Sequence, residues 1–215
     1  MKVIDLTHTI TEDMPVYPSS EAPKLQETST YEKDGFKETR MTMSSHTGTH
    51  MDSPGHLFAH RTTLDAMPID QFTGMALVVD CSDLHEGQKI TIDYINKNRE
   101  KAEKAEFILF RLGWDQYWGT DAYFGDYPVI DDEVIRFLLD TKKKGVGLDV
   151  MGIDPIADEN LTIHKKLFIN NEIVVIENLK NLQFLGNDLF LFCVLPLKYR
   201  NSDGSPIRAI AIFKE

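Results

Sequence analysis

The sequence is poor in cysteine, with only Cys81 and Cys193 among its 215 residues. They lie far apart in apolar surroundings, and neither belongs to a Cys-x-x-Cys pair. We therefore expect two buried thiols rather than a disulfide or a cysteine-based metal site. A chain of this length can bury roughly 70% of the surface that its unfolded form exposes. It needs no disulfides for stability, and we expect one domain spanning residues 1–215.

Positive charge is also scarce, because 23 basic residues face 34 acidic ones and the formal net charge is −11. Such a balance repels phosphate backbones and anionic lipids, so we expect no nucleic-acid partner and no membrane partner. The start of the chain, MKVIDLTHTI, is too polar for a signal peptide. The most apolar late run, LFLFCVLPL, is far shorter than the ~20 residues of a membrane span. These features predict a cytoplasmic protein.

Two familiar catalytic motifs are missing as well. There is no Gly-x-Ser-x-Gly elbow, so the serine-hydrolase mechanism built on that motif is excluded. There is no glycine-rich phosphate loop either. The sequence also contains no repeat and no low-complexity block that would indicate an elongated or disordered protein.

Short apolar or alternating runs predict a series of strands. They are residues 3–6, 38–45, 75–82, 107–113, 146–154, 172–178, 189–199 and 207–214. The run at 38–45 is expected to continue directly into the histidine-rich stretch that follows it. Residues 12–23, EDMPVYPSSEAP, predict a loop because proline and serine break both periodicities.

Three segments predict helices. Residues 91–106 begin with Thr91 as a suitable N-cap. Residues 131–145 open with acidic residues and close with three lysines. We interpret the lysines as positive charge that stabilises the C-terminal end of the helix, and Gly145 as its C′ glycine. Residues 161–168 predict a short helix. Since strands outnumber helices and the order is mixed, we expect an α/β fold with a mixed sheet or barrel and flanking helices.

The stretch HTGTHMDSPGH, residues 46–56, concentrates metal-ligand residue types: His46, His50, Asp52 and His56. On a straight strand, at ~3.3 Å per residue, His46 and His50 would lie about 13 Å apart. That distance is too long for one ion, whose bonds to nitrogen measure about 2 Å. A helix is disfavoured by the Thr-Gly-Thr segment and by Pro54. We therefore expect a strand that curls at Gly48 and brings the side chains at 46, 50 and 52 together.

Two imidazoles and a carboxylate, with no cysteine nearby, are typical of a catalytic metal site that keeps an open position. The simpler alternative is a set of satisfied core histidines beside an ordinary turn, but four such residues in this order favour metal binding. His50, Asp52 and His164 would also satisfy the facial triad of iron(II) oxygenases, which leaves His46 and His56 unexplained. A non-catalytic module that keeps a metal for stability is the third alternative.

The motif resembles the His-x-Gly-Thr-His-x-Asp-x-Pro-x-His pattern of the putative cyclase family, which includes bacterial-type kynurenine formamidases and isatin hydrolases. Every fixed position is filled, and further segments resemble the family: VIDLTHTI, MPVYP, FRLGW, GLDVMGID, VVIENLKNL and SPIRAIAI. The resemblance implies a swivelling β/β/α fold and a homodimer or higher homo-oligomer. It also implies one or two divalent metal ions, zinc in most cases and manganese in some members.

The same resemblance implies roles for individual residues. His46, His50 and Asp52 would bind one ion, and His56 would carry a proton. A later histidine and glutamate would be further ligands. His164 is the only histidine in the C-terminal half of the chain, and its alternative place is a surface helix. For the glutamate, the VVIENL context favours Glu177 over Glu172, and the alternative for Glu177 is a loop cap.

These groups predict the hydrolysis of a small amide. A divalent ion can lower the pKa of its bound water to about 7 and stabilise an oxyanion, while a histidine moves a proton to the leaving amine. The resemblance implies an arylformamide such as N-formyl-L-kynurenine, or else an isatin-like cyclic amide. Tyr17, Phe58 and Trp114 are candidates for binding an aromatic substrate, and packing under a loop or at a dimer interface is their alternative role.

Overall fold

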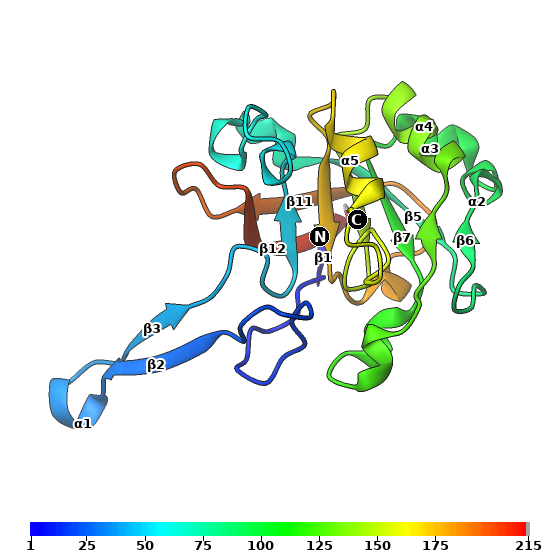
Figure 1. Cartoon of the computed structure of the whole chain (residues 1–215). Coiled ribbons are helices and arrows are strands. Elements are labelled where there is room, and N and C mark those ends of the chain that lie inside the picture. The colour runs from blue at the N-terminus through cyan, green and yellow to red at the C-terminus, as the bar shows by residue number, and fades with distance from the viewer. Residues whose placement is uncertain (214–215) are drawn as a thin grey trace.

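The computed structural model describes residues 1–213 and has a closed β-barrel at its centre (Figure 1). The main sheet has the strand order β1-β12-β11-β5-β7-β9-β10-β4, and β4 also pairs with β12. This last pairing closes seven strands into a ring, to which β1 (Lys2–Asp5) is added along β12. Short helices pack outside the barrel. The expected mixed α/β fold with a barrel and flanking helices is confirmed.

The ring consists of one group of parallel strand pairs and one group of antiparallel strand pairs. β5, β7, β9 and β10 pair in parallel, whereas β4, β11 and β12 make only antiparallel pairs. The bounds of the seven strands are β4 (His50–Asp52), β5 (Thr73–Asp80), β7 (Phe107–Arg111), β9 (Gly145–Leu148), β10 (Val174–Glu177), β11 (Phe190–Pro196) and β12 (Gly204–Phe213).

Alternating side chains divide the core into an inner and an outer cluster. Along β7, Phe107 and Leu109 belong to the cluster that fills the barrel, whereas Ile108 and Phe110 pack outside against the helices. The helices are α2 (Ile92–Asn96), α3 (Arg99–Lys104), α4 (Asp132–Asp140) and α5 (Thr162–Phe168), beside the strand pair β6 (Lys89–Ile90) and β8 (Val129–Ile130). On β4, Met51 faces the barrel interior. His50 and Asp52 therefore point to the outer face.

The helix expected at 91–106 is in fact two helices. α2 ends at Asn96, and α3 begins at Arg99 after Asn98 takes an irregular backbone conformation. Thr91 does occupy the N-cap position of α2. The break follows from the two asparagines, whose short polar side chains compete for backbone hydrogen bonds and favour turns over helix interiors.

The predicted end of the helix at 131–145 is wrong. α4 ends at Asp140, and Lys142 takes the left-handed conformation (φ +52°) expected of Gly145. The amides of Lys142 and Lys143 close the end by donating to Leu139 O and Leu138 O. Gly145 instead begins β9, where a Cβ would lie 2.8 Å from the Phe107 ring.

The side chains of Lys143 and Lys144 do not satisfy the end of their own helix either. The Lys143 ammonium is buried and donates to the carbonyls of Glu103 and Ala105, at the end of α3. Lys144 Nζ donates to the carbonyls of Asp70 and Thr73. These two ammonium groups therefore donate to backbone carbonyls of other segments.

A hairpin arm projects from the barrel and was only partly expected from the sequence (Figure 1). It consists of β2 (Lys24–Ser29), α1 (Tyr31–Asp34) and β3 (Glu38–Thr42), and every residue of β3 is exposed. β2 was not predicted. β3 stops at Thr42 rather than running into the histidine-rich stretch, and the chain reaches the barrel only at β4.

Three further expectations concern single features. Cys81 is buried, but Cys193 is only half-buried, on a face of β11 where Leu191 and Leu195 are exposed; both are free thiols. The strand at 207–214 is observed as part of β12, and Lys214 lies outside the described residues. Within residues 1–213, no helix is long and apolar enough to cross a membrane.

Candidate metal centre

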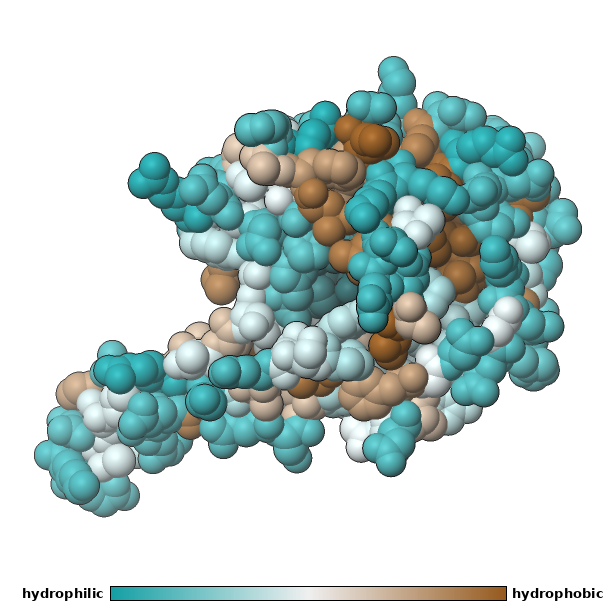
Figure 2. All heavy atoms as spheres, viewed as in Figure 1, coloured by the Kyte–Doolittle hydropathy of each residue, from teal (hydrophilic) through white to brown (hydrophobic). Residues whose placement is uncertain are grey.

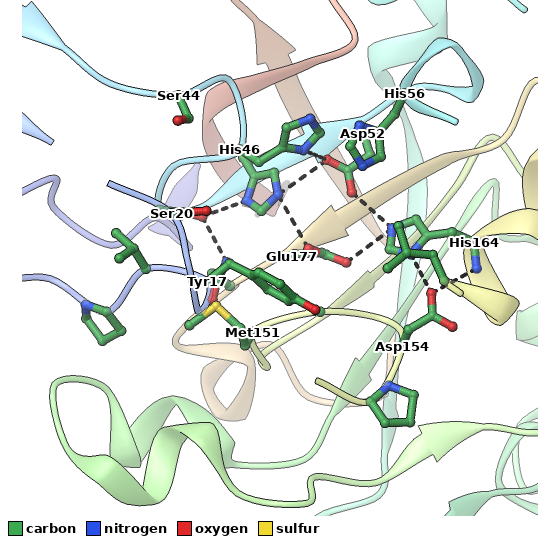
Figure 3. Close-up of a pocket in the computed structure, with 18 of the residues that line it drawn as sticks. Tyr17, Ser20, Ser44, His46, Asp52, His56, Met151, Asp154, His164 and Glu177 are labelled. Carbon is green, nitrogen blue, oxygen red and sulfur yellow. Dashed lines mark hydrogen bonds and ion pairs between the residues drawn. The ribbon is translucent and has the colours of Figure 1, made fainter. Parts of the chain in front are cut away.

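A cavity of about 520 Å³ lies on the outer face of β4 and β10, beside α5. Figure 2 shows this side of the molecule hollowed between the base of the arm and the barrel, with hydrophilic residues around the hollow. Its floor carries the expected histidines and acidic residues (Figure 3). The loop after β1 and the loop between β9 and α5 form its walls, through Pro15, Val16, Tyr17, Ser20, Met151, Pro155, Glu159 and Leu161.

Two adjacent strands present three of the polar side chains on the floor. His50 and Asp52 are two residues apart on β4 and so point the same way. Glu177 at the end of β10 is the register partner of His50, and its Oε2 lies 3.4 Å from His50 Nε2. His50 Nδ1 lies 2.8 Å from the carbonyl of Gly48, which directs Nε2 toward the cavity.

The turn before β4 brings His46 to the same place. Gly48 has φ +65°, a left-handed conformation that favours glycine, and the chain bends there as expected. As a result His46 Nδ1 lies 2.6 Å from Asp52 Oδ1, and the rings of His46 and His50 meet edge to face at 5.2 Å. The side chains at 46, 50 and 52 therefore converge.

His164 comes from α5, on the opposite side of Asp52. Its Nε2 lies 3.1 Å from Asp52 Oδ2 and 3.4 Å from Glu177 Oε1. Its Nδ1 lies 2.6 Å from Asp154 Oδ2, and the Asp154 carboxylate also accepts the backbone amides of Ile163 and His164 at the start of α5. Asp154 thus fixes both the helix start and the orientation of the imidazole. His164 is buried and does not lie on an exposed helix face.

The carboxylates dominate the electrostatics of this cluster. Burial opposes the charged form of His46, but the charge of Asp52 and the hydrogen bond to Asp203 outweigh it and raise the pKa of His46 to about 9. Burial is likewise outweighed at His164, where Asp154 and Asp52 raise the pKa to about 10. Burial would raise the pKa of Asp52, but the surrounding histidines hold it well below its usual value. The chain therefore stabilises paired opposite charges here.

Two donor sets share Asp52: His46, His50 and Asp52, and Asp52, His164 and Glu177. Within each set, one nitrogen or oxygen atom per residue lies within 4.8 Å of the others. Imidazole and carboxylate donors of this kind suit zinc and manganese. The donor chemistry therefore fits divalent metal ions, and Asp52 is the residue common to both sets. A third set, which sequence reasoning did not find, is formed by His46, His56 and Asp203.

His56 lies at the edge of this cluster, at the end of a 3₁₀ turn (Pro54–His56). Its ring centroid is 4.1 Å from that of His46, and its Nδ1 is 3.7 Å from Asp203 Oδ2. Burial lowers the pKa of His56 below the usual 6.5. This shift favours the neutral imidazole, which can accept a proton.

The three aromatic candidates are placed differently. Tyr17 lines the cavity, and its hydroxyl donates to the carbonyl of Ile156. Phe58 does not line the cavity and packs against the outer core cluster. Trp114 is buried beside a different cavity, with its indole N–H donated to the carbonyl of Tyr123. The structure therefore brings Tyr17, but neither Phe58 nor Trp114, to the cavity.

Sequence reasoning chose Glu177 over Glu172 and missed two acidic residues. Glu177 reaches the cluster, whereas Glu172 pairs with Arg61 on the surface at 2.8 Å. Asp154 and Asp203 both contact histidines of the cluster. Asp154 lies in the segment GLDVMGID and Asp203 in the segment NSDGSP. Neither segment indicates which distant histidine its aspartate contacts.

The chain is similar to several known proteins in sequence and in structure. The model of the putative cyclase family matches residues 4–155. An uncharacterized protein of Methanocaldococcus jannaschii is 33% identical over 218 residues, which cover 99% of this chain and 100% of that protein. Kynurenine formamidase of Bacillus anthracis is 26% identical, with 97% and 96% of the two chains covered. Isatin hydrolase A from Labrenzia aggregata has a similar structure, with a TM-score of 0.87, 25% identity, and coverage of 100% and 94%.

Proposed function

This chain belongs to the putative cyclase family, and from that premise we propose that it is a metal-dependent hydrolase cleaving a carbon–nitrogen bond of a small amide. The observation that carries the proposal is the pair of donor sets that share Asp52 on the floor of the cavity. A closed structural site would have no such open space beside it. The same opening argues against a module that keeps metal only for stability.

His46, His50 and Asp52 would hold one ion, and Asp52, His164 and Glu177 the other. When bound, zinc or manganese would supply a water that is deprotonated at neutral pH and a Lewis acid for the carbonyl oxygen. A facial-triad oxygenase is not favoured, because His46 and Glu177 adjoin the triad residues and complete two donor sets.

The chain's own residues perform the remaining steps. His56, in its neutral form, accepts a proton from the attacking water and passes it to the leaving nitrogen. Tyr17, Met151 and Leu161 supply aromatic and apolar surface on which a flat substrate is held. The volume of about 520 Å³ suits a small molecule.

We infer that the substrate is an arylformamide such as N-formyl-L-kynurenine, in line with the relation to kynurenine formamidase over nearly the whole chain. An isatin-like cyclic amide is the second candidate, and the similarity in structure to isatin hydrolase A favours it. Both substrates present an aryl-linked amide carbonyl to the same cluster. They differ in what leaves after the carbon–nitrogen bond is cleaved.

We also propose that the chain assembles as a homodimer. The hairpin arm supports this, because a two-stranded hairpin is marginally stable by itself in water. The arm exposes Tyr31, Phe36 and Met41, and a second copy of the chain would cover them. Light scattering on the purified protein measures the mass, and a monomer at all concentrations would contradict this proposal.

The function is tested with metal-stripped protein resupplied with zinc or manganese. N-formyl-L-kynurenine and isatin are offered separately, and turnover is followed by absorbance. We expect metal-restored hydrolysis of one of them, its loss in His50→Ala, and its retention in His85→Ala, which changes a histidine outside this cavity. Hydrolysis that persists without metal, or a chain that retains no metal, would overturn the proposal.

A further inference from the structure

Asp203 precedes β12 and reaches the metal-ligand cluster from the side opposite Asp52. We propose that Asp203 is a positioning residue that fixes the orientation of His46, so that Nδ1 of this imidazole is the nitrogen presented to a metal ion. This inference rests on the proposed function, since it assigns a hydrogen-bond partner to His46, which the proposed function makes a metal ligand. It adds a residue that lies outside the histidine-rich motif.

The contacts of His46 carry the first step. Its Nδ1 lies 2.6 Å from Asp52 Oδ1, and its Nε2 lies 3.0 Å from Asp203 Oδ2. An imidazole that binds a metal through one nitrogen keeps its proton on the other and donates it, most often to a carboxylate or a carbonyl. Because Asp52 belongs to both donor sets, the Nδ1 side faces the metal position. The Nε2 proton is then the one donated to Asp203.

Asp203 is itself held in place without help from His46. The hydroxyl of Ser45 donates to Asp203 Oδ2 at 3.2 Å. The hydroxyl of Tyr199 lies 3.2 Å from Oδ1, although the carbonyl of Gly204 is its shorter contact. The Asp203 carbonyl accepts the amide of Ser53 at 2.9 Å and its hydroxyl at 2.8 Å. A carboxylate fixed by so many contacts can direct the ring beside it rather than follow it.

The neighbouring glycine restricts the ring further. A Cβ on Gly204 would lie 2.4 Å from Cε1 of His46, so the imidazole rests directly against the backbone there. Gly204 is also the register partner of Asp52 across β12 and β4. The strand pairing that closes the barrel thus brings the Asp203–Gly204 pair against a histidine 157 positions away in the sequence.

The position of His56 offers a different role for Asp203. Its Nδ1 is 3.7 Å from Asp203 Oδ2, and His46, His56 and Asp203 form a donor set of their own. If Asp203 were a ligand, its removal would abolish one bound ion. If it orients His46, its removal weakens binding but leaves the number of ions at saturation unchanged. Stoichiometry therefore separates the two roles.

The test compares zinc binding by the metal-stripped full chain for wild type, Asp203→Ala and Asp203→Asn, by competition with a chromophoric chelator. We expect Asp203→Ala to weaken zinc binding by about 10–100-fold, as loss of such a partner commonly does. Asp203→Asn keeps an oxygen acceptor but loses the charge, so its zinc affinity should lie between those of the wild type and Asp203→Ala. At saturating zinc, the number of ions per chain should match that of the wild type.

Asp65→Asn is the matched control, because Asp65 holds the same loop through Asn201 and Ser202, whereas Asp203 contacts His46. It should bind zinc as tightly as the wild type. If Asp203→Ala does not fold, the zinc affinities of Asp203→Asn and Asp65→Asn are compared instead, and the weaker binding is expected in Asp203→Asn. Unchanged affinity in the Asp203 variants, equal weakening by Asp65→Asn, or the loss of one ion at saturation would each overturn the inference.

Kinetics provide a second readout. With zinc saturating, a misoriented ligand should lower kcat of Asp203→Ala more than it raises KM, because substrate contacts are untouched. A wild type that binds zinc tightly but hydrolyses neither amide would contradict the proposed function alone, and the zinc affinities would still decide the role of Asp203.

Discussion

Glu177 and His50 stand opposite each other in the antiparallel pair of β10 and β4, with Glu177 Oε2 3.4 Å from His50 Nε2. The two residues belong to different donor sets, yet their contact is fixed by backbone register. The sheet therefore sets the distance between one residue of each donor set. A change at either residue should alter one position and leave the barrel intact.

Glu177→Gln should remove one of two bound ions. An amide oxygen is a weaker ligand than a carboxylate, so we expect the bound metal to fall from two ions per chain to one, and kcat to fall at least 100-fold. Metal analysis after dialysis measures this loss. Glu172→Gln is the matched control, because it removes only a surface ion pair with Arg61. Equal metal contents in the two variants would contradict the assignment of Glu177.

His56→Asn should lower kcat by about 10²–10⁴-fold, the usual contribution of a general acid–base group. Its metal content should stay at the wild-type value, since neither donor set that shares Asp52 includes it. His60→Asn changes an exposed histidine four positions later and should have little effect. Loss of metal in His56→Asn would instead make His56 a ligand. Steady-state kinetics and metal analysis of the same preparations distinguish the two.

Tyr17→Ala should raise KM for an aromatic amide about 10-fold and change kcat little. The ring contributes apolar area to binding but does not contact the donor sets, so its loss weakens substrate binding most. Tyr117→Ala is a close match, because both side chains are 37% exposed and Tyr117 lines a different cavity. Equal KM values for the two variants would exclude Tyr17 from the substrate site.

The charge of the cavity predicts which part of the substrate is recognised. Among the described residues that line it, none is lysine or arginine, and Glu159 lies on its wall. A substrate carboxylate therefore finds no lysine or arginine side chain among the described residues that line this cavity. We expect N-formylkynurenamine, which lacks the carboxylate, to have a kcat/KM within about 3-fold of that of N-formyl-L-kynurenine. A loss of more than 10-fold would require a carboxylate-binding group from outside this cavity.

Asp149 should make stability depend on pH in a direction opposite to most aspartates. Burial raises its pKa to about 7, although its carboxylate accepts the amides of Leu112 and Gly113. Between its ordinary pKa of 3.8 and about 7, the folded state holds a proton that the unfolded state has lost. The contribution of Asp149 to stability is therefore lost as pH rises through this window.

Asp149→Asn removes this titration. The free energy of unfolding of the variant, relative to the wild type, should rise by roughly 2–3 kcal/mol between pH 5 and pH 8. Urea unfolding with EDTA present measures it without interference from metal binding. A difference that does not change with pH would show that Asp149 titrates alike in the folded and unfolded states.

Predictions from the sequence were best where the evidence is local. Strands such as 75–82 and 107–113 were recognised because apolar side chains recur along short runs. Helix ends were less predictable. Glycine is the residue type expected just after a helix, so the sequence predicts the helix end at Gly145. In the structure, Gly145 is a glycine because it packs against Phe107 in the sheet, and Lys142 takes the left-handed conformation instead. β2 was missed because its side chains are almost all exposed and polar.

By itself, the sequence determined the concentration of ligand residue types at 46–56, because residues a few positions apart stay near one another in any fold. Only the tertiary structure decided which distant groups join them. Strand register selects Glu177 rather than Glu172, and closure of the barrel brings Asp203 beside His46. Packing of the outer core places Trp114 away from the cavity. Such contacts depend on strand order and register, which no short stretch of sequence contains.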